Sequence, residues 1–479
     1  MTINDDTYDY ILAIDQGGHA SRATLYTPDG KIIASASKTI TTKRIPVKDK
    51  LFIQHNVNEI YHSIQAVILI CSKKIDDPRK FKIKAGIATQ RSTIVCWNYK
   101  TGEVLSDAIS WQDTRAENII KDYEAKRTQI KNKTGLFLSA HYGVSKMLWC
   151  LENLANVKKA QENNELCIAP LSSYLLYSCV AGRNRYVDPA NAARTLLFNK
   201  DSLNWDDELL NLFSIPKSIL ANCVTTKYNY GQLLNWNGQC DVTICTGDQS
   251  AAVFSNGMPS DKQFTVNIGS GAFVLNINEQ NKIPDRILSG SIYTDKSKRI
   301  KAWEGTVNGA GTALDWLQDQ NKTIDIYDLL TNKMQHYRDN IPVFINGISG
   351  VGSPYWITIL KSRFIGEAKT TAKAIAVIES IVFLIAENIN LMKIKSNSEI
   401  KISGGLSVLD GMCQRLSDIT KMNVVRATDK EATLLGLLHL LTDFRVNLVQ
   451  KNSCNFKPCA NSTLENRFNE WQREMKNEK

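Results

Sequence analysis

The stretch "AIDQGGHASRATLYTPDG", residues 13–30, decides the fold. Apolar residues lead into Asp15, a turn with Gly17 and Gly18 follows, and a second strand-forming run comes directly after the turn. With the further turn at its end, this pattern predicts three strands over residues 8–37. Glycine has no Cβ, so the first turn lets backbone N–H groups converge on an anion.

A second hairpin has the same layout. In "QFTVNIGSGAFVLNINE", residues 263–279, the turn Gly269-Ser270-Gly271 again joins two strand-forming runs. Such a repeat predicts two similar halves, each offering a glycine hairpin to a shared cleft. Either hairpin alone also fits an ordinary bulged turn, but the pair favours a nucleotide site. In the first hairpin, Asp15 could hold Mg²⁺ against the charge of the anion, and Arg22 could add a cationic contact.

Length and composition limit the possible classes of protein. The 479 residues are too many for one ordinary core, so two domains are expected. With 43% hydrophobic and 22% charged residues, the composition is that of a globular protein. The formal net charge is +10, but the basic residues are scattered, which favours a lysine-rich surface and an anionic ligand over nucleic-acid binding.

The cysteines and the apolar runs bear on the cellular compartment. Many of the 11 cysteines stand in apolar runs, as in "AVILIC", which predicts reduced, buried thiols in a cytoplasmic protein. Their spacing does not predict a zinc site. The start "MTINDDTYDY" is polar and predicts no signal peptide. No apolar run is expected to approach the roughly 18 residues of a membrane span, so no membrane partner is predicted.

Helices alternate with strands in the second half of the chain, which indicates an α/β class with an antiparallel hairpin at the edge of each sheet. Apolar residues at helical spacing predict a deeply packed helix within "TAKAIAVIESIVFLIAENINLMK", and "EATLLGLLHLLTDF" predicts a late core helix. "EIKISGGLSV" predicts a strand that ends in Gly404 and Gly405. The domain boundary is expected near residues 250–260, and the polar tail is expected to end in a solvated helix, "LENRFNEWQREM".

The segment "ICTGDQSAAVF" carries the candidate catalytic residue. A buried strand ends at Gly247, and Asp248 precedes a predicted helix. Asp248 is either a helix N-cap or a base that accepts a proton from a substrate hydroxyl, while Gln249 hydrogen-bonds a neighbouring oxygen. The glycine pair 404–405 either turns the chain or permits close approach of a base or ribose. No Walker A sequence is present, and "GISGVG" does not satisfy the dinucleotide fingerprint.

Taken in order, these segments resemble the FGGY carbohydrate kinases and, among them, are most similar to the glycerol kinases. The likeness extends from about residue 8 to 445, too many ordered motifs for a chance match. The segments that carry it are "AIDQGGHASRA", "GIATQRSTIVCWNYKTGEVLSDAISWQDTRA", "TGLFLSAHYGVSKMLWCLEN", "DPANAARTLLFN", "TGDQSAAVF", "GSPYWITILKSRFIG" and "SGGLSVLDGM".

The resemblance implies two actin-like domains of the ribonuclease H type with a nucleotide and substrate cleft between them. The expected divisions are an N-terminal kinase domain at 1–252, a C-terminal ATP-binding domain at 253–445 and a polar C-terminal tail at 446–479. The implied reaction is ATP-dependent phosphorylation of a hydroxyl on a small sugar or polyol, with ATP and Mg²⁺ as cofactors. Asp248 would be the general base, and Asp15 would be the Mg²⁺-associated carboxylate.

The resemblance also implies three groups of binding residues. The acceptor would be surrounded by Arg91, Ser92, Trp111, His141, Asp248, Gln249 and Phe273. The phosphates would lie against Asp15, Gly17, Gly18, His19, Arg22, Gly269, Ser270 and Gly271. The adenosine pocket would be lined by Gly311, Asp315, Gly404 and Gly405.

Departures from the family pattern bear on the acceptor. Glycerol kinases carry Glu at the position of Ser92 and Tyr at that of His141, and the shorter Ser92 leaves room for a larger sugar or polyol. Two threonines of the phosphate turn are replaced by Gly18 and His19, and His19 either binds a phosphate or points to solvent. The alternatives are a glycerol kinase proper and a non-catalytic nucleotide-binding regulator of the same fold. Assembly as a homodimer or homotetramer is expected by analogy only.

Overall fold

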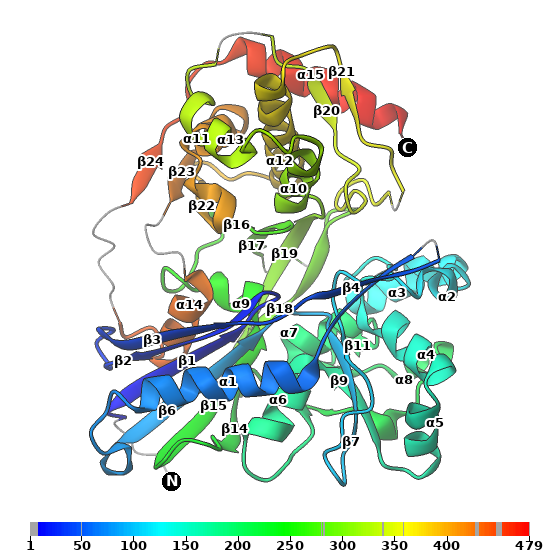
Figure 1. The fold of residues 1–479 in the computed structure, drawn as a ribbon, viewed down its shortest axis with the longest axis vertical. Helices are drawn as coiled ribbons and strands as arrows, with labels where there is room; N and C mark the ends of the chain where they lie inside the picture. Colours follow the sequence, from blue (N-terminus) through cyan, green and yellow to red (C-terminus); the bar gives the residue numbers. More distant parts are fainter. Residues whose placement is uncertain are drawn as a thin grey trace. The chain divides into compact units, whose positions relative to one another are not determined.

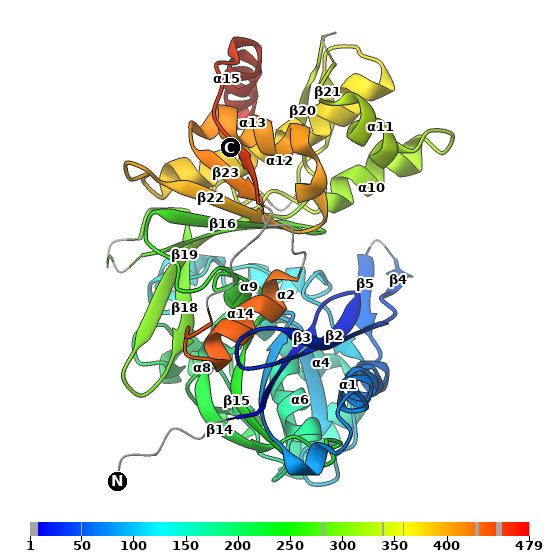
Figure 2. The same cartoon turned by 90° about the vertical axis from the view of Figure 1, so that its left-hand side faces the viewer.

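The computed structural model describes residues 8–48, 50–278, 280, 283–337, 340–357, 359–426, 431–446 and 453–478. The start of the chain, for which no signal peptide is predicted, lies outside these residues up to residue 7. The chain forms two compact units (Figure 1, Figure 2). Unit 1 contains Met1–Met258, Ser289–Lys301 and Thr433–Leu448. Unit 2 contains Pro259–Leu288, Ala302–Ala432 and Val449–Lys479.

Unit 1 is built on a six-stranded sheet with the order β14-β15-β6-β1-β2-β3. The strands are β1 (Tyr10–Gln16), β2 (Ala20–Tyr26), β3 (Ile32–Thr39), β6 (Lys82–Thr89), β14 (Lys227–Gln232) and β15 (Gln239–Gly247). Strand β1 pairs antiparallel with β2 and parallel with β6, and β6 pairs parallel with β15. The three strands predicted for residues 8–37 are therefore confirmed as β1, β2 and β3.

Helices cover this sheet. Helix α1 (Val57–Ser72) packs against β1, β2 and β3. Helix α14 (Ala432–Leu441) reaches β6 at Gly86, where an added Cβ would lie 3.2 Å from Leu441 Cδ1 and 3.3 Å from Leu437 Cδ2. Strand β1 is an almost continuous apolar run with its interior residues all buried, which is typical of a strand covered on both faces.

A second, five-stranded sheet in unit 1 has the order β4-β5-β8-β7-β9. Its strands are β4 (Lys43–Val47), β5 (Lys50–His55), β7 (Ile94–Asn98), β8 (Ala108–Ile109) and β9 (Leu166–Pro170). Helix α4 (Gly143–Asn153) packs against β7 and β9. Strand β7 of this sheet begins two residues after Ser92, so the sheet anchors the segment that carries the expected acceptor pair Arg91-Ser92.

Unit 2 repeats the strand pattern of unit 1. The seven-stranded sheet has the order β18-β19-β17-β16-β22-β23-β24, and unit 2 contains β16, β17, β22, β23, β24 and most of β19. The strands are β16 (Gln263–Ile268), β17 (Ala272–Ile277), β18 (Leu288–Thr294), β19 (Arg299–Val307), β22 (Glu399–Ser403), β23 (Asn423–Arg426) and β24 (Cys454–Phe456). Strand β16 pairs antiparallel with β17 and parallel with β22, and β22 pairs parallel with β23. The run β19-β17-β16-β22-β23 thus has the pairing pattern of β3-β2-β1-β6-β15, and the predicted internal repeat is confirmed.

Antiparallel pairs do stand at the edges of the unit 1 sheet, where β3 pairs with β2 and β14 pairs with β15, but the two glycine turns follow interior strands. Strands β1 and β16 are interior, because each has an antiparallel partner on one side and a parallel partner on the other. An interior strand delivers its turn to the line where the carboxyl ends of the parallel strands finish.

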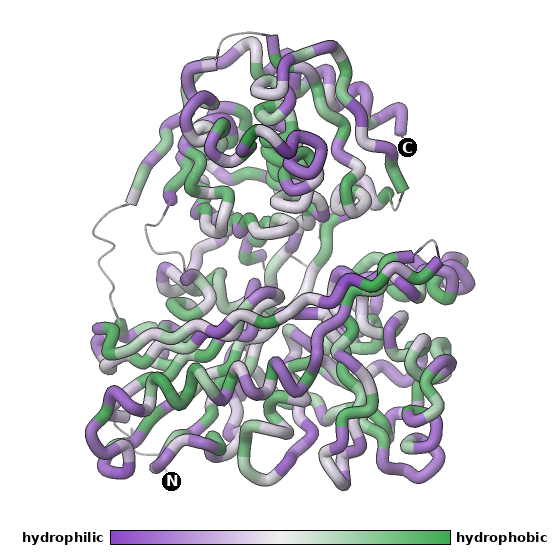
Figure 3. Tube along the Cα trace, viewed as in Figure 1, coloured by the Kyte–Doolittle hydropathy of each residue, from purple (hydrophilic) through white to green (hydrophobic). Residues whose placement is uncertain are grey.

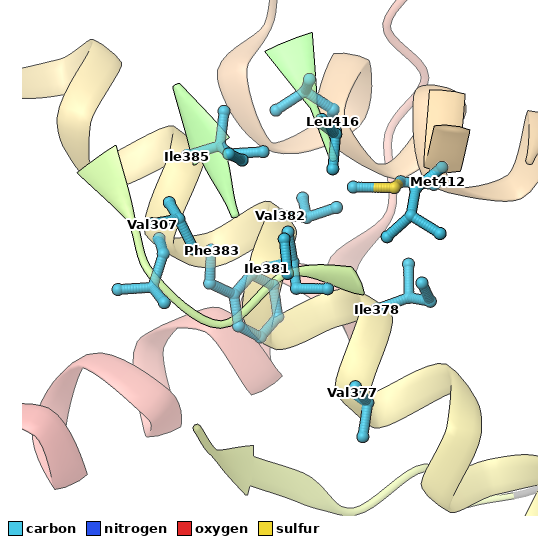
Figure 4. Close-up of a cluster of buried hydrophobic side chains, with 14 of the residues drawn as sticks. Val307, Val377, Ile378, Ile381, Val382, Phe383, Ile385, Met412 and Leu416 are labelled. Atoms are coloured by element: carbon cyan, nitrogen blue, oxygen red, sulfur yellow. The ribbon is translucent and has the colours of Figure 1, made fainter. Parts of the chain in front are cut away.

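The core of unit 2 forms around the predicted long helix, α12 (Thr370–Leu391). Figure 4 shows Ile378, Ile381 and Val382 of α12 gathered with Met412 and Leu416. Contrary to the sequence expectation, α12 is long and apolar enough to cross a membrane by length and composition. However, 83% of its most apolar window is buried in the structure, as in the core helix of a globular unit.

The C-terminal tail differs from its prediction as a polar, solvated segment. Helix α15 (Ser462–Asn477) is present, but it buries Leu464, Trp471 and Met475 in the core of unit 2. The Trp471 ring lies 5.8 Å from that of Phe383, centroid to centroid. The helix is polar on one face only, so the mean composition of the tail concealed its apolar stripe.

A buried ion cluster also fastens α15. Glu379 of α12 is 1% exposed, and its carboxylate accepts hydrogen bonds from Arg467 of α15 at 2.7 Å and from Arg415 at 3.0 Å. Arg415 lies on α13 (Asp410–Thr420). A buried carboxylate is tolerated when cations pair with it, so this cluster ties three helices of unit 2 together.

The predicted divisions 1–252, 253–445 and 446–479 stay a prediction of functional domains, but the structural units follow other boundaries. Residues 289–301 and 433–448 belong to unit 1, although most of them fall in the predicted C-terminal domain. The hydropathy of the chain agrees with two separate cores: within each unit, hydrophobic residues concentrate inside, and hydrophilic residues follow the outer loops (Figure 3).

Candidate active site

Three parallel strands of unit 1 finish at one edge of the sheet. Gln16, the last residue of β1, is in register with Thr89 of β6, and Thr89 is in register with Gly247 of β15. Parallel neighbours end at the same edge, so the segments that follow these strands converge there. This edge brings together the predicted site residues of three motifs that are far apart in the sequence.

At the end of β1, a buried carboxylate is paired with a half-buried arginine. Asp15 and Arg22 are opposite each other in the antiparallel β1–β2 pair, and Arg22 Nη1 lies 3.6 Å from Asp15 Oδ2. The side chain of Asp15 is 7% exposed and that of Arg22 is 37% exposed. The turn closes through a hydrogen bond of 3.0 Å that Gly17 N donates to Ala20 O. An ion pair therefore lies beside the glycine turn.

At the end of β15, Asp248 faces the arginine that follows β6. Arg91 Nε lies 3.9 Å from Asp248 Oδ1, and the side chain of Asp248 is 22% exposed. Helix α9 (Asp248–Ala252) begins at Asp248, and Gly247 occupies the N-cap position. The alternative role of Asp248 as the N-cap is therefore wrong, and its carboxylate accepts from Gln249 N at 2.6 Å instead.

Gly247 is a site residue that the sequence analysis did not assign. A Cβ at this position would lie 2.5 Å from Cδ and 2.6 Å from Cγ of Arg91. Only glycine lets the arginine stem pass so close to the backbone. The signal was available as a glycine between a buried strand and an aspartate, but its reason lies in the position of Arg91, far away in the sequence.

The other predicted acceptor residues of unit 1 surround the same edge. Ser92 is buried and has a left-handed backbone, with φ of 65°. The indole Nε1 of Trp111 lies 3.8 Å from the place where a Cβ of Gly18 would stand, so Trp111 borders the glycine turn. His141 accompanies Trp111, since its Nδ1 lies 3.2 Å from Trp111 O.

A buried lysine holds the segment that carries His141. Lys146 of α4 is fully buried, and its Nζ donates to the backbone oxygens of His141 at 2.5 Å, Ala140 at 3.3 Å and Tyr142 at 3.5 Å. Burial lowers the pKa of Lys146 to about 7, against the opposing influence of Asp113. Sequence analysis recognised this lysine only as part of a motif, because its role depends on a chain segment that folds back over it.

The protonation of His141 follows from its surroundings. Burial and then the charge of Lys146 lower the pKa of His141 to about 4, so the ring is neutral near pH 7. The carbonyl of Trp111 can only accept, so Nδ1 carries the ring proton. Nε2 of His141 is then a hydrogen-bond acceptor, suited to a hydroxyl donor.

In unit 2, the second glycine turn is held by backbone contacts. Gly269 N donates to Gly271 O at 2.8 Å, which closes the turn between β16 and β17. The turn rests on the start of helix α10 (Gly311–Gln320), where Gly311 N donates to Gly269 O at 3.0 Å. A Cβ on Gly311 would lie 2.8 Å from Gly269 O, and one on Gly271 would lie 2.8 Å from Val307 O. Side chains are thus excluded from both positions.

The glycine pair after β22 lies beside this turn. Gly404 has φ of 95°, and a Cβ there would lie 2.4 Å from Ile268 O at the end of β16. Gly405 is exposed, and nothing lies within 4 Å of its Cβ position. Asp315 is exposed on α10, and it accepts a hydrogen bond from Tyr327 Oη at 3.0 Å. Gly311 and Gly404 thus lie against the 269–271 turn, whereas Asp315 stands one helical turn further along α10.

The structure therefore divides the predicted site between the two units. Unit 1 holds Asp15, Gly17, Gly18, His19, Arg22, Arg91, Ser92, Trp111, His141, Asp248 and Gln249. Unit 2 holds Gly269, Ser270, Gly271, Phe273, Gly311, Asp315, Gly404 and Gly405. Phe273 is half-buried on β17, apart from the other predicted acceptor residues in the chain. His19 is exposed at the first turn.

Known proteins share this fold and this order of motifs. A glycerol kinase of Plasmodium falciparum, solved with ADP, has a TM-score of 0.85, with 23% identity and 98% of each chain covered. A ligand-bound xylulose kinase of Lactobacillus acidophilus has a TM-score of 0.79, with 20% identity and 97% of each chain covered. At these identities the likeness shows the fold, a two-unit carbohydrate-kinase architecture.

Sequence comparison is more specific. Residues 10–255 match the N-terminal domain and residues 264–441 the C-terminal domain of the FGGY family of carbohydrate kinases. A glycerol kinase of Enterococcus casseliflavus is 31% identical over 448 residues, which are 90% of this chain and 87% of that protein. A glycerol kinase of Dichelobacter nodosus is 31% identical over 451 residues, covering 90% of this chain and 89% of that protein.

The chain belongs to the FGGY family of carbohydrate kinases. It is an enzyme that phosphorylates a hydroxyl of a sugar or polyol with ATP, and the predicted resemblance and reaction are confirmed. Because the enzyme class is established, the non-catalytic regulator is the weaker of the two alternatives.

Proposed function

We propose that Asp248 is the general base that removes the proton from the attacking hydroxyl. The observation that supports this role is its position beyond β15, partly exposed to solvent and with Oδ1 at 3.9 Å from Arg91 Nε. An ionised carboxylate beside an arginine is ready to accept a proton, and Arg91 orients it. The backbone N–H of Gln249 donates to Asp248 Oδ1 at 2.6 Å and so holds the carboxylate in place at the start of α9.

The nucleotide phosphates are assigned to the turn at residues 269–271, with the adenosine beside Gly311, Asp315, Gly404 and Gly405. Backbone N–H groups of a glycine turn and of a helix start are suitable donors to phosphate oxygens. Unit 2 supports this assignment through the positions 271, 311 and 404, where a Cβ would clash with backbone atoms. Gly17, Gly18, His19 and Arg22 of unit 1 are assigned to the transferred phosphate.

Asp15 is assigned to Mg²⁺. Among the residues that the structure describes, no three His, Cys, Asp or Glu side chains form a metal-binding group, so the protein offers one carboxylate and not a cage. This donor set suits Mg²⁺, which is commonly held by one or two carboxylates together with substrate phosphates. When bound, the ion would neutralise phosphate charge, and Asp15, already compensated by Arg22, would hold it.

The acceptor is proposed to be a polyol or sugar larger than glycerol. Ser92 is short and uncharged, and neutral His141 offers Nε2 as an acceptor, so both favour neutral hydroxyl groups. Glycerol itself is the second candidate, because the similar curated proteins of Enterococcus casseliflavus and Dichelobacter nodosus are glycerol kinases.

A substrate panel tests this proposal. ADP release would be measured with Mg²⁺-ATP and three- to seven-carbon polyols and ketoses, with glycerol as reference. We expect a four-carbon or larger acceptor to give the highest kcat/KM. A glycerol optimum would overturn the larger acceptor and leave the kinase assignment intact. No acceptor-dependent ADP release from any compound would favour the non-catalytic regulator.

We infer that the enzyme works in the cytoplasm and without nucleic acid or membrane. All 11 cysteines are free thiols, and buried ones such as Cys71, whose pKa burial raises to about 11, are unreactive. Reduced buried thiols suit a reducing compartment. Assembly as a homodimer or homotetramer stays a prediction that light scattering would test.

A further inference from the structure

A chain of buried hydrogen bonds joins the glycine turn of unit 1 to the acceptor segment. Trp111 N donates to Thr93 Oγ1 at 3.1 Å, and Thr93 Oγ1 donates to Gln90 Oε1 at 3.0 Å. Gln90 Nε2 then donates to Gly17 O at 3.4 Å and to Gln16 Oε1 at 3.2 Å. Neither Gln90 nor Thr93 has a role in the proposed reaction.

The direction of every bond in this chain is determined. Gln90 Oε1 can only accept, so Thr93 donates its single hydroxyl proton to it, while Trp111 N donates to Thr93 Oγ1. The Gly17 carbonyl can only accept, so the amide of Gln90 must present Nε2 to it. Both requirements fix one orientation of the Gln90 side chain, and no alternative pairing satisfies them.

The hydrogen-bonded side chains of Gln90 and Thr93 are also shielded from water, and the backbone of Gln90 is anchored to the sheet. Thr93 is 0% exposed and Gln90 is 2% exposed, so water cannot replace a lost partner without rearrangement. The backbone of Gln90 extends the sheet, because Gln90 N donates to Gln16 O at 2.8 Å. A Cβ at Gly18 would lie 3.8 Å from Trp111 Nε1 and 4.0 Å from Gln90 Oε1, so the glycine turn is adjacent to two members of the chain.

We propose that Gln90 and Thr93 are positioning residues that couple the Gly17 turn to Trp111. When the acceptor displaces Trp111, these hydrogen bonds pass the displacement to the Gly17 turn. In the opposite direction, the Gly17 turn holds Trp111 and the acceptor segment in place. The effect of this coupling on turnover rests on the proposed function. The coupling itself needs no ligand, because the hydrogen bonds are present in the protein alone.

Hydrogen exchange of the ligand-free enzyme tests the coupling. Thr93→Val keeps the side-chain shape but leaves Trp111 N and Gln90 Oε1 without their partner. We expect amide exchange to accelerate about fivefold both at residues 110–112, where Thr93 accepts from Trp111 N, and at residues 16–19, which the chain reaches through Gln90. Acceleration at 110–112 alone would overturn the proposal.

Two further variants keep the test decisive. Gln90→Met removes the amide from the other side and is expected to accelerate both segments too, and it serves if Thr93→Val does not fold. Thr24→Val is the matched control, because it removes a buried hydroxyl of the six-stranded sheet of unit 1, 3.0 Å from Ser35 Oγ and outside the chain of hydrogen bonds. It is expected to leave residues 16–19 and 110–112 at wild-type rates.

Kinetics separate positioning from a merely structural role. With the polyol that releases ADP fastest in the substrate panel, Thr93→Val is expected to raise the acceptor KM and lower kcat about fivefold each. Thr93→Ser, which restores the hydroxyl, is expected to recover both. Unchanged KM and kcat in a folded Thr93→Val enzyme would contradict the effect on turnover. If no polyol is phosphorylated, the proposed function fails, while the exchange experiment still decides the coupling.

Discussion

The two glycine turns occupy equivalent places in the same strand pattern, yet their surroundings differ. The turn of unit 1 follows Asp15 and lies at the edge where Arg91 and Asp248 meet. The turn of unit 2 is enclosed by positions where a Cβ would strike backbone, at Gly271, Gly311 and Gly404. One turn is bordered by ionisable side chains, and the other is bordered by main chain.

This difference suggests how one fold was put to two uses. Charged side chains can exchange protons and hold a cation, so the chemistry is expected in unit 1. Main-chain N–H groups bind an anion without titrating, so unit 2 is suited to hold a nucleotide in one place. Variants that affect one turn and spare the other therefore test the division, and they are taken from the largest expected effect to the smallest.

The largest effect is expected in unit 1, at the proposed base. Asp248→Asn keeps the shape and removes the proton acceptor, so kcat should fall by about 10²–10⁴. The dissociation constant of ATP should stay near that of the wild type, because the nucleotide is assigned to unit 2. Coupled ADP assays and calorimetry with Mg²⁺-ATP measure the two quantities.

Asp241 provides the control for this variant. It lies on the same strand, β15, and is bound by Gln239 Nε2 at 3.0 Å, away from the strand end. Asp241→Asn should leave kcat unchanged. Near-normal turnover in Asp248→Asn would refute its role as base, and a parallel loss of ATP binding would contradict the division of labour between the turns.

In unit 2, the adjacent glycines 404 and 405 provide a variant and its matched control. Gly404→Ala places a Cβ 2.4 Å from Ile268 O at φ of 95°, so we expect about 2–3 kcal/mol of lost stability and a weaker ATP complex. Gly405→Ala meets nothing within 4 Å and should fold as the wild type does. Chemical denaturation and ATP titration of both variants separate the effects.

The Gly405 variant decides whether the nucleotide touches this pair. Since its Cβ has room, a rise in the ATP dissociation constant without lost stability would report direct contact with the nucleotide. Wild-type ATP binding by Gly405→Ala would remove this glycine from the assigned adenosine site.

A smaller effect is expected where unit 1 uses a glycine to place a charge. Gly247→Ala would put a Cβ 2.5 Å from Arg91 Cδ, which forces the guanidinium away from Asp248. We expect the acceptor KM to rise about tenfold with little change in ATP affinity, measured by steady-state kinetics and calorimetry. Gly290→Ala, which has open space around its Cβ, is the control. An unchanged acceptor KM in Gly247→Ala would show that Arg91 does not orient the acceptor.

The sequence predicted what short patterns determine. Both glycine hairpins and the strand before Asp248 were found, because alternating apolar runs and glycine turns are local signals. The closeness of Gly247 to Arg91 was not predicted, since it depends on the pairing of β6 with β15, two strands that are far apart in the sequence of unit 1. The same holds for Trp471, whose burial depends on an apolar stripe in a polar tail.

Long-range packing also explains why the unit boundaries differ from the predicted ones. Helix α14 is apolar, so the sequence correctly predicted a core helix, but it could not tell which core. Its Leu437 and Leu441 pack against β6 at Gly86, which has no side chain in the way. The buried Lys146 escaped assignment for a related reason, because its three backbone partners belong to the segment just before its own helix.

The smallest expected effect concerns Lys146. It tests whether unit 1 also has a titrating group behind the segment that carries His141. Burial lowers the pKa of Lys146 to about 7, so between pH 7 and 8 the folded enzyme loses a proton that the unfolded chain, with a pKa near 10.5, keeps. The unfolded state then binds more protons, and the free energy of unfolding should rise by about 1 kcal/mol over this interval. Lys146→Met should lack the rise, whereas Lys121→Met, at an exposed lysine paired with Glu117, should keep it. Urea denaturation at pH 7, 7.5 and 8 measures the difference, and equal slopes in the wild type and Lys146→Met would mean that Lys146 stays charged throughout, held by its three carbonyl partners.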